Sequence, residues 1–352
     1  MVADLALKAL IAMAPVLILL LVFDRLDVFN LIPMREITLL TLGGGALALG
    51  GLLANGGLME GFPIGRGNYT RYVSPIVEES LKAAPIVWLF ARNRLGYKLE
   101  AAIAGFAVGA GFSVTENAWY LFTIAGTNVT DWLVRGFGTA IMHGAATALF
   151  AIVSHEMSEK QSETLAAHYR FSPILFLPGL AVAMATHSTF NHFPDQPLVI
   201  MALTLLLAPL TLFLTLAKSD RATRQWLAAD AAAHRRLLEE IRAGHFTQSE
   251  IAGAIRGIGG VNTDEVMAYV ELKLELVLRA EELILASHEG ADDTAGEAER
   301  EKFARLEAAE RHLGKTVVAA IGSRLGFTRN DLYELDRLRA RLADSNSHAV
   351  SS

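Results

Sequence analysis

The feature that most constrains this chain is a series of long apolar runs in its first 217 residues. A helix needs about 20 predominantly apolar residues to cross the hydrocarbon of a bilayer, and backbone groups in lipid must find hydrogen bonds within their own segment. Seven runs approach that length, and they cover residues 5–23, 37–58, 73–91, 101–122, 132–153, 173–193 and 197–217. We therefore predict an all-α fold, a polytopic bundle of about seven transmembrane helices in residues 1–217.

The composition changes after residue 217. About an eighth of residues 1–217 are charged, against about a third of residues 218–352. Amphipathic helical patterns fill most of the second part, as expected of helices with one solvated face. We predict a C-terminal soluble α-helical domain over 218–344 and a disordered tail over 345–352.

Basic residues mark one side of the predicted bundle. Arg92, Arg94 and Lys98 follow the third span, and Lys218 follows the last, whereas the loop 123–131 contains no lysine or arginine. Cytoplasmic loops carry an excess of these residues. We therefore expect a multi-pass protein whose C-terminus is cytoplasmic.

The composition also excludes some chemistry. The chain has no cysteine, which rules out disulfides, thiolate metal ligands and a cysteine nucleophile. Its net charge of −6 gives no electrostatic reason to expect nucleic acid as a partner. The lipid bilayer is the one partner that the apolar runs require.

Ionisable side chains inside the spans are the candidates for function. Each costs about 2.5–3.5 kcal/mol on insertion scales, so such residues are rare unless they are paired or functional. They are Glu78, Glu79 and Lys82 in the third span, Glu116 in the fourth, Arg135 and His143 in the fifth, and His187 and His192 in the sixth. We interpret Arg135 and His192 as incidental, because both lie where a side chain can reach the interface.

Four of these residues lie at a common depth. Glu79 lies about five residues from the outer end of its span, Glu116 about eight, His143 about eleven and His187 about six. At 1.5 Å per residue the depths are about 7–17 Å from the outer face, although the spans alternate in direction. We expect one site in the outer half of the membrane.

Helical spacing adds detail to this site. Glu78 and Glu79 precede Lys82 by four and three residues, so either carboxylate can reach the ammonium. His187 and Asn191 share one face, and we expect the imidazole and the amide to point into the same cavity. Carboxylates and imidazoles around a cavity can bind a metal or activate water as a general base.

Four motifs in successive spans resemble those of the PrsW family of intramembrane proteases, which is similar to the CAAX-prenyl endopeptidase and bacteriocin-immunity superfamily. They are EESLK at 78–82, FSVTE at 112–116, His143 in MHGAATA, and HSTFN at 187–191. The resemblance covers about residues 75–193. It implies an endopeptidase of the bacterial cytoplasmic (inner) membrane that cuts a single-span membrane protein, such as an anti-sigma-factor-like protein.

The resemblance also implies roles for the residues. Glu78 or Glu79 acts as general base on a water near His143 and His187, while Asn191 stabilises the oxyanion. Glu116 is a second acid or a metal ligand. The expected metal set is Glu116, His143 and His187, with zinc as the ion, and a metal-free glutamate-activated water is the alternative. The C-terminal domain lies outside the resemblance, and its partner is unknown.

Two other functions compete with proteolysis. Intramembrane Glu and His residues also form proton relays, so a proton-coupled transporter is one rival. We find no paired broken helices of the kind that inverted-repeat transporters contain. A non-catalytic membrane scaffold or sensor, with a structural polar cluster, is the other.

Overall fold

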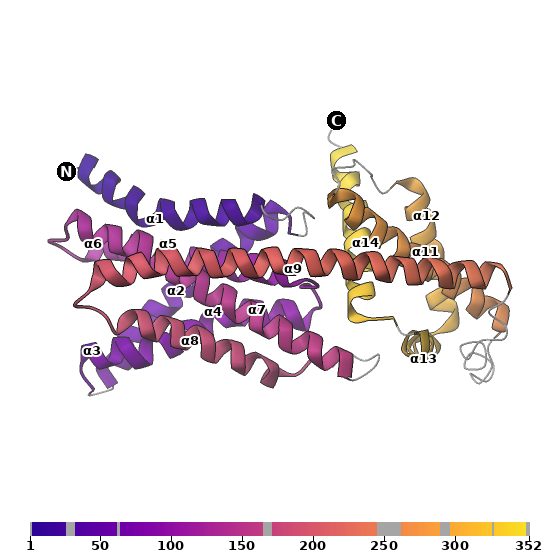
Figure 1. Cartoon of the computed structure of the whole chain (residues 1–352), viewed down its shortest axis with the longest axis horizontal. Helices are drawn as coiled ribbons and strands as arrows, with labels where there is room; N and C mark the ends of the chain where they lie inside the picture. Colours follow the sequence, from indigo (N-terminus) through magenta and orange to yellow (C-terminus); the bar gives the residue numbers. More distant parts are fainter. Residues whose placement is uncertain are drawn as a thin grey trace. The chain divides into compact units, whose positions relative to one another are not determined.

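The computed structural model describes residues 2–25, 32–61, 64–164, 171–244, 262–288, 296–325 and 327–349, and these residues are almost all helical (Figure 1). The contacts divide the chain into two compact units, residues 1–159 with 171–220, and residues 160–170 with 221–352. Each unit has its own hydrophobic core.

Among the described residues, six helices are long and apolar enough to cross a membrane. In chain order they are α1 (Val2–Arg25), α2 (Met34–Gly61), α5 (Lys98–Thr123), α6 with η2 and α7 (Val129–Val134, Arg135–Thr139 and Ala140–Thr164), η3 with α8 (Pro173–Phe176 and Leu177–Asn191), and α9 (Pro197–Arg242). A helical membrane bundle is thus confirmed.

The predicted third span is also a helix, α4 (Ser74–Ala91). Glu78, Glu79 and Lys82 make it less apolar than the other six, yet all three side chains are buried. The short helix α3 (Arg66–Asn68) and the π-helical turn η1 (Tyr69–Val73) precede it. Helix α4 packs against α2, α5 and α8, so its polar face is turned toward other helices.

Helices α5 and α7 form the interior of the first unit. Most of their residues are buried, whereas α1, α2, α8 and the apolar part of α9 are mainly exposed, as expected of helices that face lipid. Small residues allow the close contact between α5 and α7. A Cβ atom on Gly109 would overlap the carbonyl oxygen of His143, and one on Gly105 would lie 2.5 Å from that of Thr147.

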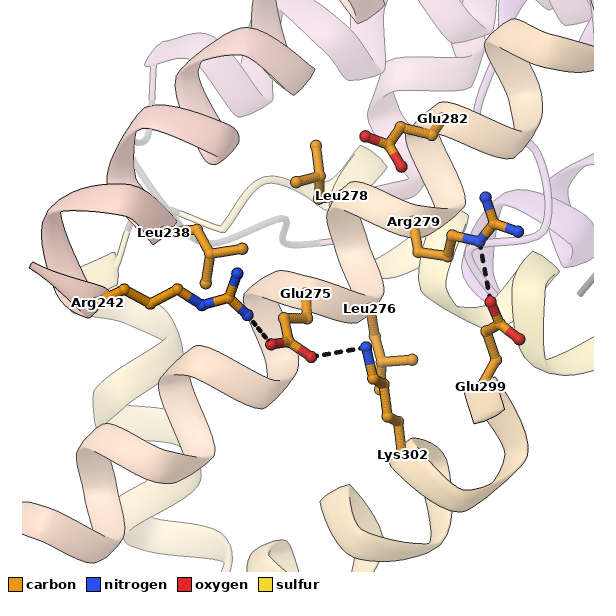
Figure 2. Close-up of a pocket in the computed structure, with 9 residues that line it drawn as sticks. All are labelled: Leu238, Arg242, Glu275, Leu276, Leu278, Arg279, Glu282, Glu299 and Lys302. Carbon is orange, nitrogen blue, oxygen red and sulfur yellow. Dashed lines mark hydrogen bonds and ion pairs between the residues drawn. The ribbon is translucent and has the colours of Figure 1, made fainter. Parts of the chain in front are cut away.

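The second unit contains the C-terminal part of α9 with α11 (Thr263–His288), α12 (Glu297–Leu313), α13 (Lys315–Leu325) and α14 (Arg329–Ala349). Their apolar faces enclose a core that includes Val270, Leu276 and Leu306. Figure 2 shows part of its surface, where Glu275 pairs with Arg242 and Lys302. Residues 345–352 were predicted to form a disordered tail, but helix α14 runs to Ala349. Residues 350–352 lie outside the described residues.

Candidate active site

The buried ionisable residues of the first unit come from four helices and meet at one place. Helix α4 supplies Glu78, Glu79 and Lys82, α5 supplies Glu116, α7 supplies His143 and α8 supplies His187. All six are buried. Glu78 lies near the start of α4, and Glu116 and His187 lie near the ends of α5 and α8. The residues therefore occupy one level of antiparallel helices.

Glu79 lies at the centre of the first group of contacts. Its Oε1 atom accepts hydrogen bonds from Lys82 Nζ at 2.5 Å and from His187 Nδ1 at 2.7 Å. The same ammonium lies 2.8 Å from Nδ1 of His143. Lys82 thus pairs with Glu79, three residues before it, and not with Glu78. The Lys82 ammonium balances the charge of the Glu79 carboxylate. The hydrogen bond between Glu79 and His187 keeps Nδ1 of His187 turned toward α4.

Glu116 belongs to a second group of contacts. Its Oε2 atom lies 3.2 Å from Arg135 Nη2 and 3.4 Å from His143 Nε2. Arg135 also donates from Nε to Asn117 Oδ1 at 2.8 Å, and its guanidinium lies 4.2 Å from the ring centre of Tyr120. The π-helical turn η2 begins at Arg135, and such turns are frequent at functional sites. The interpretation of Arg135 as an incidental basic residue is wrong, because its side chain turns inward and pairs with Glu116.

Glu78 differs from the other two carboxylates. Its Oε1 atom accepts hydrogen bonds from Ser74 Oγ at 2.6 Å and Asn55 Nδ2 at 3.0 Å, both of them neutral donors. The Tyr69 hydroxyl holds Asn55 by donating to its Oδ1 at 2.9 Å. The Oε2 atom of Glu78 is buried and has no hydrogen-bond partner. A buried oxygen of this kind calls for an explanation, and an ion is one.

The unpartnered oxygen lies beside both histidines. Glu78 Oε2 is 4.0 Å from His187 Nε2, and the two imidazole rings are perpendicular, with centres 4.8 Å apart. One ligand atom from each of Glu78, His143 and His187 lies within 4.8 Å of the others. One carboxylate and two imidazoles form a common set of protein ligands for a catalytic metal. The residues therefore fit a metal, although an ion at His143 would replace one of its contacts with Lys82 or Glu116.

Two expectations from the sequence differ from the contacts in the structure. Glu116 was expected to complete the metal set; in the structure it pairs with Arg135, and Glu78 is the carboxylate with a ligand atom within 4.8 Å of those of both histidines. Asn191 was expected to point into the site with His187, but its side-chain nitrogen donates to the carbonyl oxygen of Thr70 at 2.9 Å. The helix ends at Asn191, where the amide turns toward the chain segment before α4.

An apolar cavity of about 670 Å³ lies between α7, α8 and α9. Its wall includes Met142 and Thr186, which precede His143 and His187 in the sequence. Leucines of α9, among them Leu203 and Leu207, form the opposite side. The cavity therefore borders both helices that carry the histidines, α7 and α8.

The fold and the site define a multi-pass membrane protein with an ionisable cluster buried among its spans. The model of the PrsW family intramembrane metalloproteases matches residues 35–217, which is just over half of the chain, and the chain belongs to this family. It is therefore a peptidase that acts within the membrane. Searches of curated proteins and of solved structures found no match.

Proposed function

We propose that this peptidase is metal-dependent, and that Glu78, His143 and His187 hold the ion. The observation that carries the proposal is the distribution of charge. Lys82 pairs with Glu79 and Arg135 pairs with Glu116, but Glu78 has neutral donors on one oxygen and no partner on the other. Because an unbalanced charge is costly inside a membrane, a divalent cation suits this position. Zinc is the ion that we expect from the two imidazoles and one carboxylate.

The remaining residues of the cluster have supporting roles. When bound, the metal would polarise the scissile carbonyl and make water more acidic. Glu79 accepts the Nδ1–H of His187 and so fixes the tautomer that leaves Nε2 available as a ligand. Lys82 balances the charge of Glu79.

Proton transfer falls to Glu116 in this proposal. Its side chain is 11 % exposed, more than that of either other carboxylate, and it stands beside His143. The carboxylate takes a proton from the attacking water, and the same proton goes to the amine that leaves. Arg135 acts as a positioning residue. It donates from Nη2 to Glu116 and from Nε to Asn117, and these two bonds fix the guanidinium beside the carboxylate.

The substrate that we propose is a single-span membrane protein, for example one of the anti-sigma-factor-like kind. The apolar cavity between α7, α8 and α9 suits a membrane-spanning segment, because its wall carries the neighbours of both histidines and consists mostly of apolar side chains. We propose a bacterial inner membrane as its location, from the family resemblance, and a cytoplasmic C-terminus, from the basic residues of alternate loops.

A cleavage assay tests the metal and the substrate class together. Purified full-length protein in liposomes is mixed with a labelled single-span reporter, then assayed after chelation and after zinc is returned. We expect cleavage to stop on chelation and to return with zinc. Full activity in metal-free protein would instead favour a water activated by Glu78 alone, and no cleavage of any single-span reporter would count against the substrate class.

The absence of cysteine makes the orientation easy to test. Single-cysteine variants Ala125→Cys, in the loop after α5, and Glu301→Cys, in α12, place one thiol on each expected side. An impermeant thiol reagent added to intact cells should label residue 125 and should label residue 301 only after lysis. The reverse pattern would overturn the orientation.

A further inference from the structure

The second unit contains a cluster of three carboxylates and one imidazole that the peptidase mechanism does not use. Its members are Asp230, His234, Glu281 and Asp331, and one ligand atom from each lies within 4.8 Å of the others. They come from α9, α11 and α14, three helices that are separate in sequence. All four belong to the C-terminal unit.

Local structure explains how the four side chains meet. Asp230 and His234 are four residues apart on α9 and share one face of the helix. Glu281 projects from α11, where its Oε1 atom lies 2.7 Å from Nδ1 of His234. Asp331 lies in the first turn of α14 and accepts the backbone N–H of Thr328 at 2.6 Å through Oδ2. That bond fixes the other oxygen, Oδ1, inside the cluster.

Three oxygens in the cluster are buried without a hydrogen-bond partner. They are Oδ2 of Asp230, Oε2 of Glu281 and Oδ1 of Asp331. Glu281 and Asp331 are fully buried, so water does not reach their side chains from outside. Few buried polar atoms in native proteins lack a partner, so three in one place call for an explanation, and a bound cation is one.

The charge of the cluster supports the same conclusion. Elsewhere in this unit several acidic residues have basic partners: Glu275 has Arg242 and Lys302, and Glu299 has Arg279 (Figure 2). Within the described contacts, His234 is the only basic residue that pairs with any of the three carboxylates.

We propose that Asp230, His234, Glu281 and Asp331 bind one divalent transition-metal ion. Three oxygens and one imidazole nitrogen suit ions such as Mn²⁺ or Zn²⁺ better than Ca²⁺ or Mg²⁺, whose protein ligands are oxygen atoms. The ion links α9, α11 and α14, which are separate in sequence, so its role is to stabilise the packing of these helices in the C-terminal domain. The proposal does not depend on the mechanism of the peptidase site.

Counting bound Mn²⁺ tests the proposal. Full-length protein in a non-ionic detergent is freed of metal and titrated with Mn²⁺, and the bound ion is measured by the loss of the free-ion electron paramagnetic resonance signal. The Glu281→Gln chain should bind one ion fewer than the parent, or bind it about 100-fold more weakly, because loss of a ligand costs at least as much as loss of an outer contact. Circular dichroism and gel filtration check that the variant is folded.

The matched control is Glu282→Gln, the same change at the next residue. Glu282 is partly exposed and pairs with Arg235 at 2.8 Å, so its loss should leave the ion count unchanged. Both variants are also made in a Glu78→Gln, His187→Ala chain, which lacks two of the proposed ligands in the membrane site. The Glu281→Gln and Glu282→Gln proteins should still differ by one bound ion in this chain, whether or not the membrane site binds metal. If Glu281→Gln does not fold, Asp230→Asn takes its place.

Equal ion counts in the Glu281→Gln and Glu282→Gln chains would overturn the proposal. The same holds if the Glu78→Gln, His187→Ala chain, with Glu281 and Glu282 intact, binds no Mn²⁺ or Zn²⁺. In that event the three carboxylates share protons instead of an ion.

Discussion

The Nδ1 atom of His187 lies 2.7 Å from Oε1 of Glu79, and this contact sets the direction in which the histidine faces the rest of the site. Because Nδ1 is engaged with Glu79, Nε2 is turned toward the unpartnered oxygen of Glu78. A carboxylate that orients a ligand histidine in this way also raises its basicity. In the proposed metal site, Glu78 is therefore a ligand and Glu79 orients one.

The first prediction concerns this orienting contact. Glu79→Gln should lower kcat/KM and the affinity for zinc by about 10–100-fold, the usual cost of removing the partner of a metal-bound histidine. Ser188→Ala is the control, because the Ser188 hydroxyl donates to the carbonyl oxygen of Arg71 and belongs to another contact. Equal activity of the Glu79→Gln and Ser188→Ala proteins would remove Glu79 from the site.

The second prediction concerns proton transfer. Glu116→Gln should lower kcat by about 10²–10⁴-fold, the usual contribution of general acid–base catalysis, with the zinc content unchanged. Arg135→Ala should also lower kcat, and Arg135→Lys should recover part of the loss because the positive charge beside Glu116 is restored. If zinc is lost together with activity in Glu116→Gln, Glu116 is a ligand and our assignment of Glu78 is wrong.

The third prediction concerns Asn191. The sequence pattern favours an oxyanion-stabilising amide, whereas in the structure this amide donates to the carbonyl of Thr70. Asn191→Ala should therefore retain most of its cleavage activity in the reporter assay. A loss comparable to the 10²–10³-fold cost of removing an oxyanion donor, as an order of magnitude, would return Asn191 to the catalytic site.

The fourth prediction concerns helix packing beneath the site. Gly109→Ala should destabilise the protein by about 1–3 kcal/mol, the usual cost of overpacking, because the added methyl group would overlap the His143 carbonyl. Gly43→Ala is the matched control, since nothing lies within 4 Å of a Cβ atom there. Unfolding in mixed detergent micelles measures both. Equal stability of the two variants would contradict the close packing of α5 on α7.

The sequence predicts the bundle well because each span is a local property. A run of apolar residues long enough to cross the membrane has no other stable structure in lipid, so α1, α2 and α5 follow from the sequence alone. The family model that matches residues 35–217 confirms the prediction of a peptidase. Depth along antiparallel helices also brings Glu79, Glu116, His143 and His187 to one level.

The contacts of each side chain could not be predicted in the same way, because they depend on the rotation of each helix about its own axis relative to its neighbours. Arg135 lies in a π-helical turn, whose altered residue spacing changes the face on which a side chain appears. Asn55, which lies on α2 and outside the four motifs, donates a hydrogen bond to Glu78. Spacing allowed Lys82 to reach either glutamate, and in the structure its ammonium contacts Glu79 and His143.

The central claim is that Glu78 is a metal ligand required for peptide-bond cleavage. The most direct test counts zinc per chain and measures reporter cleavage in the same preparations of wild type and Glu78→Gln. The account predicts that Glu78→Gln loses one zinc ion relative to wild type and loses cleavage, while its helix content and elution volume stay unchanged. A Glu78→Gln protein that keeps its full zinc content and cleaves at the wild-type rate would contradict it.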